Sequence, residues 1–130
     1  MSAYASFDRS GFPVITIRFS GVKATPENFA FYLDELERNY DRQEPIAIIF
    51  DATKGLPLHP MYQQKQAQWM KQFEPLIRKF CRGIAFIIPN PLIRQTLKLI
   101  FSIQRNPAPF KVFSTMEEGV AWSKEQIMAR

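Results

Sequence analysis

The sequence predicts a single α/β domain over residues 1–130, with a mixed, mostly parallel sheet of five strands and four helices. The chain is 130 residues long, 46% hydrophobic and 22% charged, which is the size and balance of one globular domain. Segments 45–51 and 83–89 are apolar at consecutive positions, as in parallel strands covered on both faces. Helical periodicity lies between them, so the expected order is ββαβαβαβα.

An antiparallel hairpin is expected at the edge of the sheet. Residues 14–20 alternate strictly, with Ile15, Ile17 and Phe19 on one face and polar side chains on the other. Residues 3–8 show a weaker form of this alternation, and a glycine and a proline lie between the two segments.

Two helices are expected before segment 83–89. Thr25, Pro26 and Glu27 form a helix start, because the hydroxyl can cap, proline fits the first turn and the acid favours the helix dipole. This helix should run from about 26 to 40. A second apolar stripe, from Tyr62 to Phe80, continues through Pro75, which predicts one helix with a kink near 71–75.

The last third of the chain has equally clear start signals. Asn90 and a following proline open a helix that should run to about 105. Residues 109–113 (PFKVF) form a short last strand. Two overlapping capping boxes, 114–117 and 115–118, precede the final helix.

The net charge of +5 is unevenly distributed. Residues 1–57 hold six Lys/Arg and eight Asp/Glu (net −2), while residues 58–130 hold eleven and four (net +7). A basic half can attract nucleic acid, anionic lipid or an acidic protein face. No nucleic-acid motif accompanies the charge, so a solvated basic surface is the favoured interpretation and nucleic-acid binding is not expected.

Cysteine content and hydropathy favour a cytoplasmic protein. Cys81 is the only cysteine, so no intramolecular disulfide can form. The N-terminal residues lack the pattern of a secretory signal, and the longest apolar runs are far too short to span a bilayer. Peripheral contact with an anionic membrane remains compatible with the basic half.

The predicted order resembles the STAS superfamily, and within it the SpoIIAA-like group of small bacterial proteins. The segments that carry the resemblance are 46–51 (IAIIFD), 82–86 (RGIAF) and 112–122 (VFSTMEEGVAW). The resemblance covers nearly the whole chain. It implies a non-enzymatic regulatory module that works through contacts with a protein partner or by self-association.

One departure from that family concerns phosphorylation. Anti-sigma-factor antagonists of the superfamily carry a phosphorylated serine at the start of the helix after the central strand. This chain has Leu58, His59, Pro60 and Met61 at about that place. Thr53 is the nearest hydroxyl, but it lies early in the loop and is interpreted as a turn residue.

Candidate binding residues follow the central strand, since loops at the carboxyl ends of parallel strands usually bind ligands. They are Asp51, Thr53, Lys54 and His59. Asp51 can hold a cation or cap a turn. A second acid at ligand spacing is missing, so no metal is expected.

Catalysis is not expected. His59 and Cys81 are the only histidine and thiol, which suggests a nucleophile pair, but a buried packing role for Cys81 is favoured. The sequence contains no phosphate-binding, dinucleotide, serine-hydrolase or zinc-protease motif, so neither enzyme activity nor a cofactor is predicted.

The aromatic content suggests an alternative function. The chain has twelve Phe, and rings such as Trp69 and Phe73 can line a pocket if the kinked helix stands off the sheet. The protein would then carry or sense an apolar or lipid-like small molecule, with Arg94 or Lys98 at the mouth. A solvated face on a core-packing helix explains the same two cations and is favoured.

Overall fold

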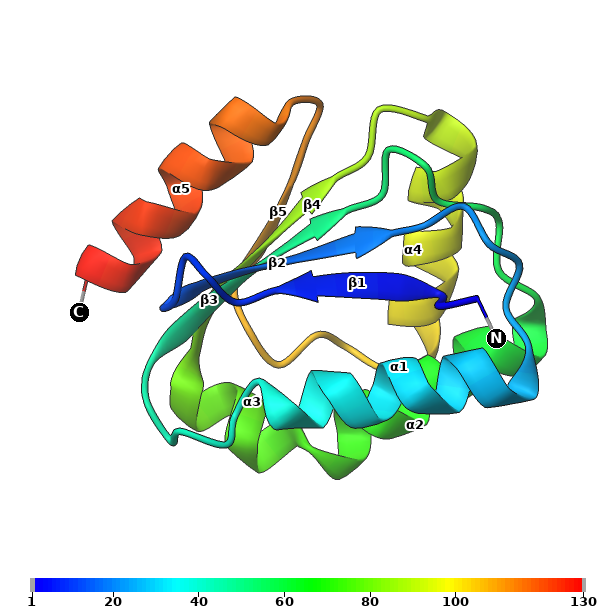
Figure 1. Ribbon diagram of the computed structural model, residues 1–130, viewed down its shortest axis with the longest axis horizontal. Helices are drawn as coiled ribbons and strands as arrows, with labels where there is room; N and C mark the ends of the chain where they lie inside the picture. The colour runs from blue at the N-terminus through cyan, green and yellow to red at the C-terminus, as the bar shows by residue number, and fades with distance from the viewer. Residues whose placement is uncertain (1, 130) are drawn as a thin grey trace.

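Five strands form one mixed sheet in the order β1-β2-β3-β4-β5 (Figure 1). The computed structural model describes residues 2–129. The strands are β1 (Ala5–Asp8), β2 (Val14–Phe19), β3 (Ile46–Asp51), β4 (Cys81–Ile87) and β5 (Phe110–Phe113). β1 is antiparallel to β2, and every other pair is parallel. The predicted mixed sheet with an edge hairpin is confirmed.

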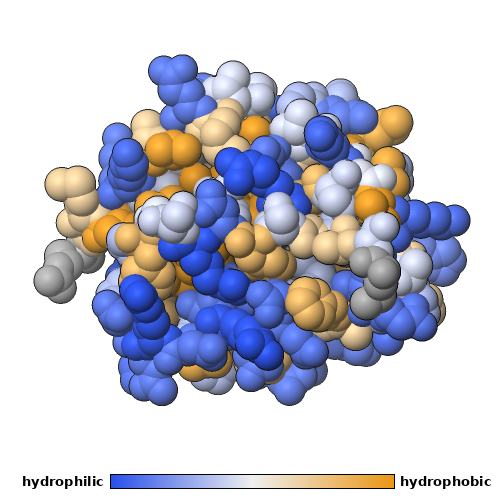
Figure 2. All heavy atoms as spheres, in the orientation of Figure 1, coloured by the Kyte–Doolittle hydropathy of each residue, from blue (hydrophilic) through white to orange (hydrophobic). Residues whose placement is uncertain are grey.

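The helices lie on two sides of this sheet (Figure 1). They are α1 (Pro26–Arg38), α2 (Pro60–Gln72), α3 (Glu74–Phe80), α4 (Pro91–Ile103) and α5 (Met116–Met128). The crossovers from β2 to β5 all advance in one direction, so right-handed connections place α1 to α4 on one face. α5 covers the other face. Figure 2 shows hydrophilic residues gathered over the lower part of the visible surface, where α1 lies.

The expected helix starts are present. Thr25 and Asn28 form a reciprocal capping box before α1, and Asn90 accepts a hydrogen bond from the Leu92 N–H at 2.9 Å. Before α5, the hydroxyl of Thr115 accepts a bond from the Glu118 N–H at 3.3 Å. The second of the two overlapping capping boxes is therefore the one that the fold uses.

The prediction of four helices is wrong, because segment 60–80 forms two helices instead of one kinked helix. Proline lacks an N–H, and its ring clashes with the carbonyl four residues earlier, here that of Lys71. The chain leaves helical geometry at Phe73, whose φ and ψ are −100° and 14°. Hydrogen bonds of 3.0 Å still join Phe73 to Trp69 and Ile77 to Phe73 across this break.

α5 packs close to the sheet because two glycines leave room for it. A Cβ at Gly83 would lie 2.9 Å from the Trp122 ring and 2.9 Å from the Gln126 side chain. A Cβ at Gly119 would collide with the side chain of Ile87. On this face Ile49, Ala85 and Ile87 form a small, closely packed cluster under α5.

The opposite face carries a thicker, aromatic layer. Phe50 stacks on Phe86 with ring centres 5.3 Å apart, and Phe19 stacks on Phe50 at 5.8 Å. Phe29 of α1 meets Tyr62 of α2 at 5.0 Å. α2 and α4 pack mainly against each other. Large rings therefore separate these helices from the sheet.

Candidate ligand-binding cavity

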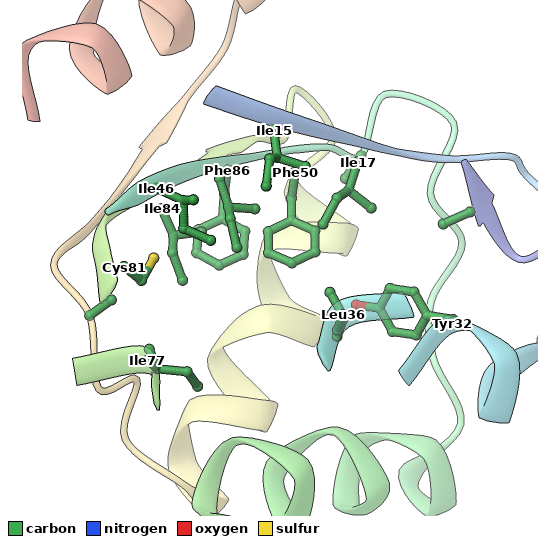
Figure 3. Packing of buried hydrophobic residues seen from close by; sticks show 14 of the residues in the cluster. Ile15, Ile17, Tyr32, Leu36, Ile46, Phe50, Ile77, Cys81, Ile84 and Phe86 are labelled. Carbon is green, nitrogen blue, oxygen red and sulfur yellow. The ribbon is translucent and has the colours of Figure 1, made fainter. Parts of the chain in front are cut away.

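A cavity of about 110 Å³ lies between the sheet and helices α1 to α4. Phe50 and Phe86 form its floor on the sheet, and Trp69 of α2 and Leu97 of α4 face them. Figure 3 shows the side chains of β3 and β4 pointing into this space, with Leu36 and Tyr32 entering it from α1. The cavity lies beside the helix that breaks at Phe73.

The lining is almost entirely apolar. Within residues 2–129, no lining side chain carries a formal charge. The polar lining groups are the amides of Gln66 and Asn106, the hydroxyl of Thr96, and the phenol groups of three tyrosines, namely Tyr4, Tyr32 and Tyr40. A guest in this cavity therefore meets hydrocarbon and a few neutral hydrogen-bonding groups.

The lining tyrosines are held in the neutral form. Burial raises the pKa of Tyr4 to about 12. Burial also raises the pKa of Tyr32 well above its ordinary value, with a smaller contribution from neighbouring Tyr4. The pKa of Tyr40 is raised by burial and by the adjacent Cys81 thiol. At neutral pH each of these phenols can donate one hydrogen bond and accept others.

The cavity reaches the surface where the segment 52–59 meets α2 and α4. Leu56 is 46% exposed although it lines the cavity. Gln66 and Thr96, also in the lining, are half-buried. Segment 52–59 is anchored beside them, because the Gln63 amide donates to the carbonyl of Leu58 at 2.8 Å. The cavity lining is therefore partly open to the surface at this point.

Asp51 and Thr53 form a turn away from the cavity. Asp51 accepts hydrogen bonds from the N–H and the hydroxyl of Thr53, at 3.0 and 2.6 Å. Its other oxygen lies 3.7 Å from the Arg18 guanidinium. Since Ile48 and Phe50 face the cavity, the alternation along β3 directs Asp51 to the α5 side. Lys54 follows the turn and is exposed.

His59 and Cys81 lie at different ends of the sheet. His59 caps α2, where its Nδ1 accepts a bond from the Met61 N–H at 3.0 Å. Cys81 is buried at the start of β4. Burial raises the pKa of its thiol to about 12, so the thiolate is disfavoured at neutral pH. The two residues do not form a nucleophile pair.

Trp69 and Phe73 are in contact, but only Trp69 lines the cavity. Their ring centres are 5.0 Å apart. Trp69 projects from α2 toward the sheet, while Phe73 occupies the break between α2 and α3. Both rings were predicted to line a pocket, and Phe73 does not.

The two candidate cations of α4 have different environments. Arg94 donates from Nε to the carbonyl of Ile88 at 2.7 Å and from a terminal nitrogen to the Ser114 hydroxyl at 3.3 Å. It thereby ties the start of α4 to β4 and to the segment before α5. Lys98 is exposed. Neither side chain is part of the cavity lining.

The sequence interpretation missed the polar groups of the cavity. Tyr32 lies within the helix predicted over about 26–40, and helical periodicity does not show what its hydroxyl contacts. Gln66 and Thr96 lie in helices without any motif. The available signal was the unusual number of aromatic residues, which fits either a dense aromatic core or a cavity and locates neither.

Comparison of the chain with protein-family models gives no match, and comparison with curated proteins gives none either. No helix among the described residues is long and apolar enough to cross a membrane. Residues 2–129 contain no group of three His, Cys, Asp or Glu placed to hold a metal ion.

Proposed function

We propose that the protein binds an uncharged, largely apolar small molecule in the cavity between the sheet and helices α1 to α4, as its carrier or sensor. The observation that supports this is the cavity itself, of about 110 Å³. Protein interiors are normally packed like organic crystals, with few voids larger than a water molecule. An engineered apolar cavity of about 150 Å³ binds benzene or xenon. The space here accordingly suits a ring or a short hydrocarbon segment.

The energetics of the cavity favour a guest. Atoms that line an empty apolar cavity lose contacts on one side, and this costs about 24 cal/mol for each Å³. A fully enclosed void of about 110 Å³ would cost on the order of 2–3 kcal/mol, and the opening beside Leu56 makes this an upper bound. A ligand that fills the space restores those contacts and stabilises the folded state by mass action.

The charge of the ligand follows from the lining. A carboxylate or phosphate inside the cavity would lose its water without gaining a cationic partner, which is strongly unfavourable. The part of the ligand that enters is therefore uncharged. A charged group can be accommodated only outside the mouth near Leu56.

The two tryptophans of the chain provide a direct test. Trp69 lines the cavity, whereas Trp122 packs against Phe113 on the opposite face. A Trp122→Phe variant should show a saturable change in tryptophan emission on titration with an aromatic hydrocarbon such as ethylbenzene. The matched Trp69→Phe variant, which keeps only Trp122, should show none.

Native mass spectrometry of freshly purified protein complements this titration. We expect a co-purifying neutral molecule or an added hydrocarbon to remain bound. If the Trp69 signal stays constant across a panel of ring-sized and short-chain compounds and no added mass is found, the ligand-binding function is wrong.

A second candidate is a non-enzymatic regulatory module of the STAS, SpoIIAA-like type that acts through protein contacts without a phosphorylated serine. The exposed face of α4 favours it. Leu92, Leu99 and Ile103 are 69, 43 and 51% exposed and share one side of the helix. Residues 75–116 contain seven Lys/Arg and no acid. An apolar strip within a basic region suits a protein partner with an acidic surface.

This second function is tested by changing the strip alone. A Leu99→Ser, Ile103→Ser variant should lose a partner that wild type retains, and the wild-type complex should weaken with salt. Phe31→Ser is the control, because Phe31 is 56% exposed on α1, away from α4. If wild type sediments with anionic vesicles and retains no protein partner, a protein-contact module is contradicted. It is also contradicted if wild type, the double variant and Phe31→Ser all retain the partner equally.

A further inference from the structure

Tyr32 occupies a fixed position at one side of the cavity. It is 4% exposed and comes from the middle of α1. Its ring packs against four other aromatic rings, with centre distances of 5.2 Å to Tyr4, 5.3 Å to Phe29, 5.9 Å to Phe19 and 6.2 Å to Phe7. These contacts hold the ring in one orientation.

The hydroxyl of Tyr32 points inward from this aromatic cluster. Figure 3 shows the oxygen at the end nearest Leu36, directed into the space between the sheet and α2. None of the side-chain hydrogen bonds found within residues 2–129 involves this hydroxyl. Among the described residues, the fully buried side-chain atoms without a partner are Asn39 Nδ2 and Ser123 Oγ. The Tyr32 hydroxyl is not one of them, so it borders the open space of the cavity, where a ligand group can pair with it.

The other two phenols of the lining are placed differently. Tyr40 lies beside the thiol of Cys81. Tyr4 precedes β1 at the edge of the sheet and is less buried than Tyr32. Tyr32 is thus the more buried of the two lining phenols that do not lie beside Cys81, and Tyr4 is its polar neighbour.

We propose that the Tyr32 hydroxyl is the polar anchor of the site, and that the ligand is a ring-sized apolar molecule carrying one uncharged hydrogen-bonding group such as a carbonyl or hydroxyl. This inference rests on the ligand-binding function proposed above. The uncharged lining excludes a carboxylate at the same place. The raised pKa of Tyr32 agrees with it, because the phenol stays protonated and able to donate.

Two probe ligands of equal shape separate the polar contribution to binding affinity from the apolar contribution. Acetophenone and α-methylstyrene differ by a carbonyl oxygen in place of a methylene group. Their affinities are compared in wild type and in Tyr32→Phe, which removes only the hydroxyl. We expect acetophenone to bind about 3- to 10-fold more weakly to the variant, the range that one neutral hydrogen bond provides. The affinity for α-methylstyrene should be unchanged.

Tyr40→Phe is the matched control, since it removes the same atom from another lining tyrosine. The ratio of the two affinities should stay at its wild-type value in this variant. Far-UV circular dichroism and the melting temperature verify that both variants fold. If Tyr32→Phe does not fold, the wild-type protein still tests the inference, because it must bind acetophenone more tightly than the hydrocarbon once solubility is corrected for.

The possible failures are distinct. If neither probe binds to any of the proteins, the ligand-binding function itself is wrong. If both probes bind, but wild type and Tyr32→Phe give the same ratio of affinities, the cavity binds ligands and Tyr32 is not the anchor. If Tyr40→Phe lowers the affinity for acetophenone as much as Tyr32→Phe does, the assignment to Tyr32 is also overturned.

Discussion

Ile48 and Ile49 are neighbours in β3, are 3% and 0% exposed, and face two differently packed sides of the same sheet. Ile48 lines the cavity, and Ile49 packs in the small cluster under α5. Identical substitutions at adjacent positions therefore measure the difference between the two sides.

A phenylalanine should be tolerated at position 48 and not at position 49. We expect Ile48→Phe to change the free energy of unfolding by less than about 1 kcal/mol, because the larger ring enters free space. Ile49→Phe should lower it by about 1–3 kcal/mol, because that side is already closely packed. Urea denaturation measures both. Equal destabilisation would show that no usable space exists above Ile48.

A side chain at Gly83 should displace α5. Since a Cβ there would lie 2.9 Å from the Trp122 ring, Gly83→Ala should lower the free energy of unfolding by about 1–3 kcal/mol. Trp122→Leu makes room at the same place. In a protein that carries Trp122→Leu, the Gly83→Ala substitution should therefore lower the free energy of unfolding by less. A double-mutant cycle in urea measures this coupling, and strictly additive effects would contradict the contact.

Arg94 should support the fold, whereas Lys98 should not. Arg94→Ala removes the 2.7 Å hydrogen bond to the Ile88 carbonyl and should lower the free energy of unfolding by about 1.5–3 kcal/mol. Lys98→Ala, on the same helix but exposed, should stay within about 0.5 kcal/mol of wild type. Thermal unfolding distinguishes the two, and similar melting temperatures would argue against a structural role for Arg94.

Alkaline pH should unfold the protein through its buried phenols and thiol. The pKa of Cys81 rises from 9.0 to about 12, and that of Tyr4 from 10.0 to about 12. A group whose pKa is raised by folding stabilises the native state fully below its unfolded pKa. That contribution is lost as the pH rises toward the folded value. Stability should thus fall from pH 9 to pH 12.

Circular dichroism across this pH range measures the transition. Cys81→Ala should abolish the loss of stability that is caused by ionisation of the thiol. The loss caused by ionisation of the tyrosines should remain. In folded wild-type protein at neutral pH, Cys81 should react with iodoacetamide far more slowly than in denaturant, because it is buried. Rapid alkylation of the native protein would contradict this environment.

Local signals in the sequence were sufficient for most of the elements. The alternation of residues 14–20 and the apolar run of 45–51 predicted β2 and β3, because their periods follow from which faces are buried. Thr25, Asn90 and Thr115 marked helix starts, since a cap depends on only three or four consecutive residues. The effect of Pro75 was underestimated, and two helices were read as one.

The cavity was much harder to predict. Twelve Phe predict either a dense aromatic core or an apolar space, and the choice depends on how rings from four helices meet. Trp69 was selected correctly as a lining residue. Tyr32 was not, because helical periodicity shows which face of α1 is buried and does not show whether its hydroxyl finds a partner.

Under the proposed function, the cavity makes the amount of protein in the cell depend on its ligand. Chains that unfold are removed by proteases, so a change of 1–2 kcal/mol in stability alters abundance several-fold. A void of about 110 Å³ is large enough for its filling to produce such a change. When the ligand is scarce, turnover of the unliganded chain would increase. The steady-state level of the protein would thereby record the ligand supply even without a downstream signalling partner.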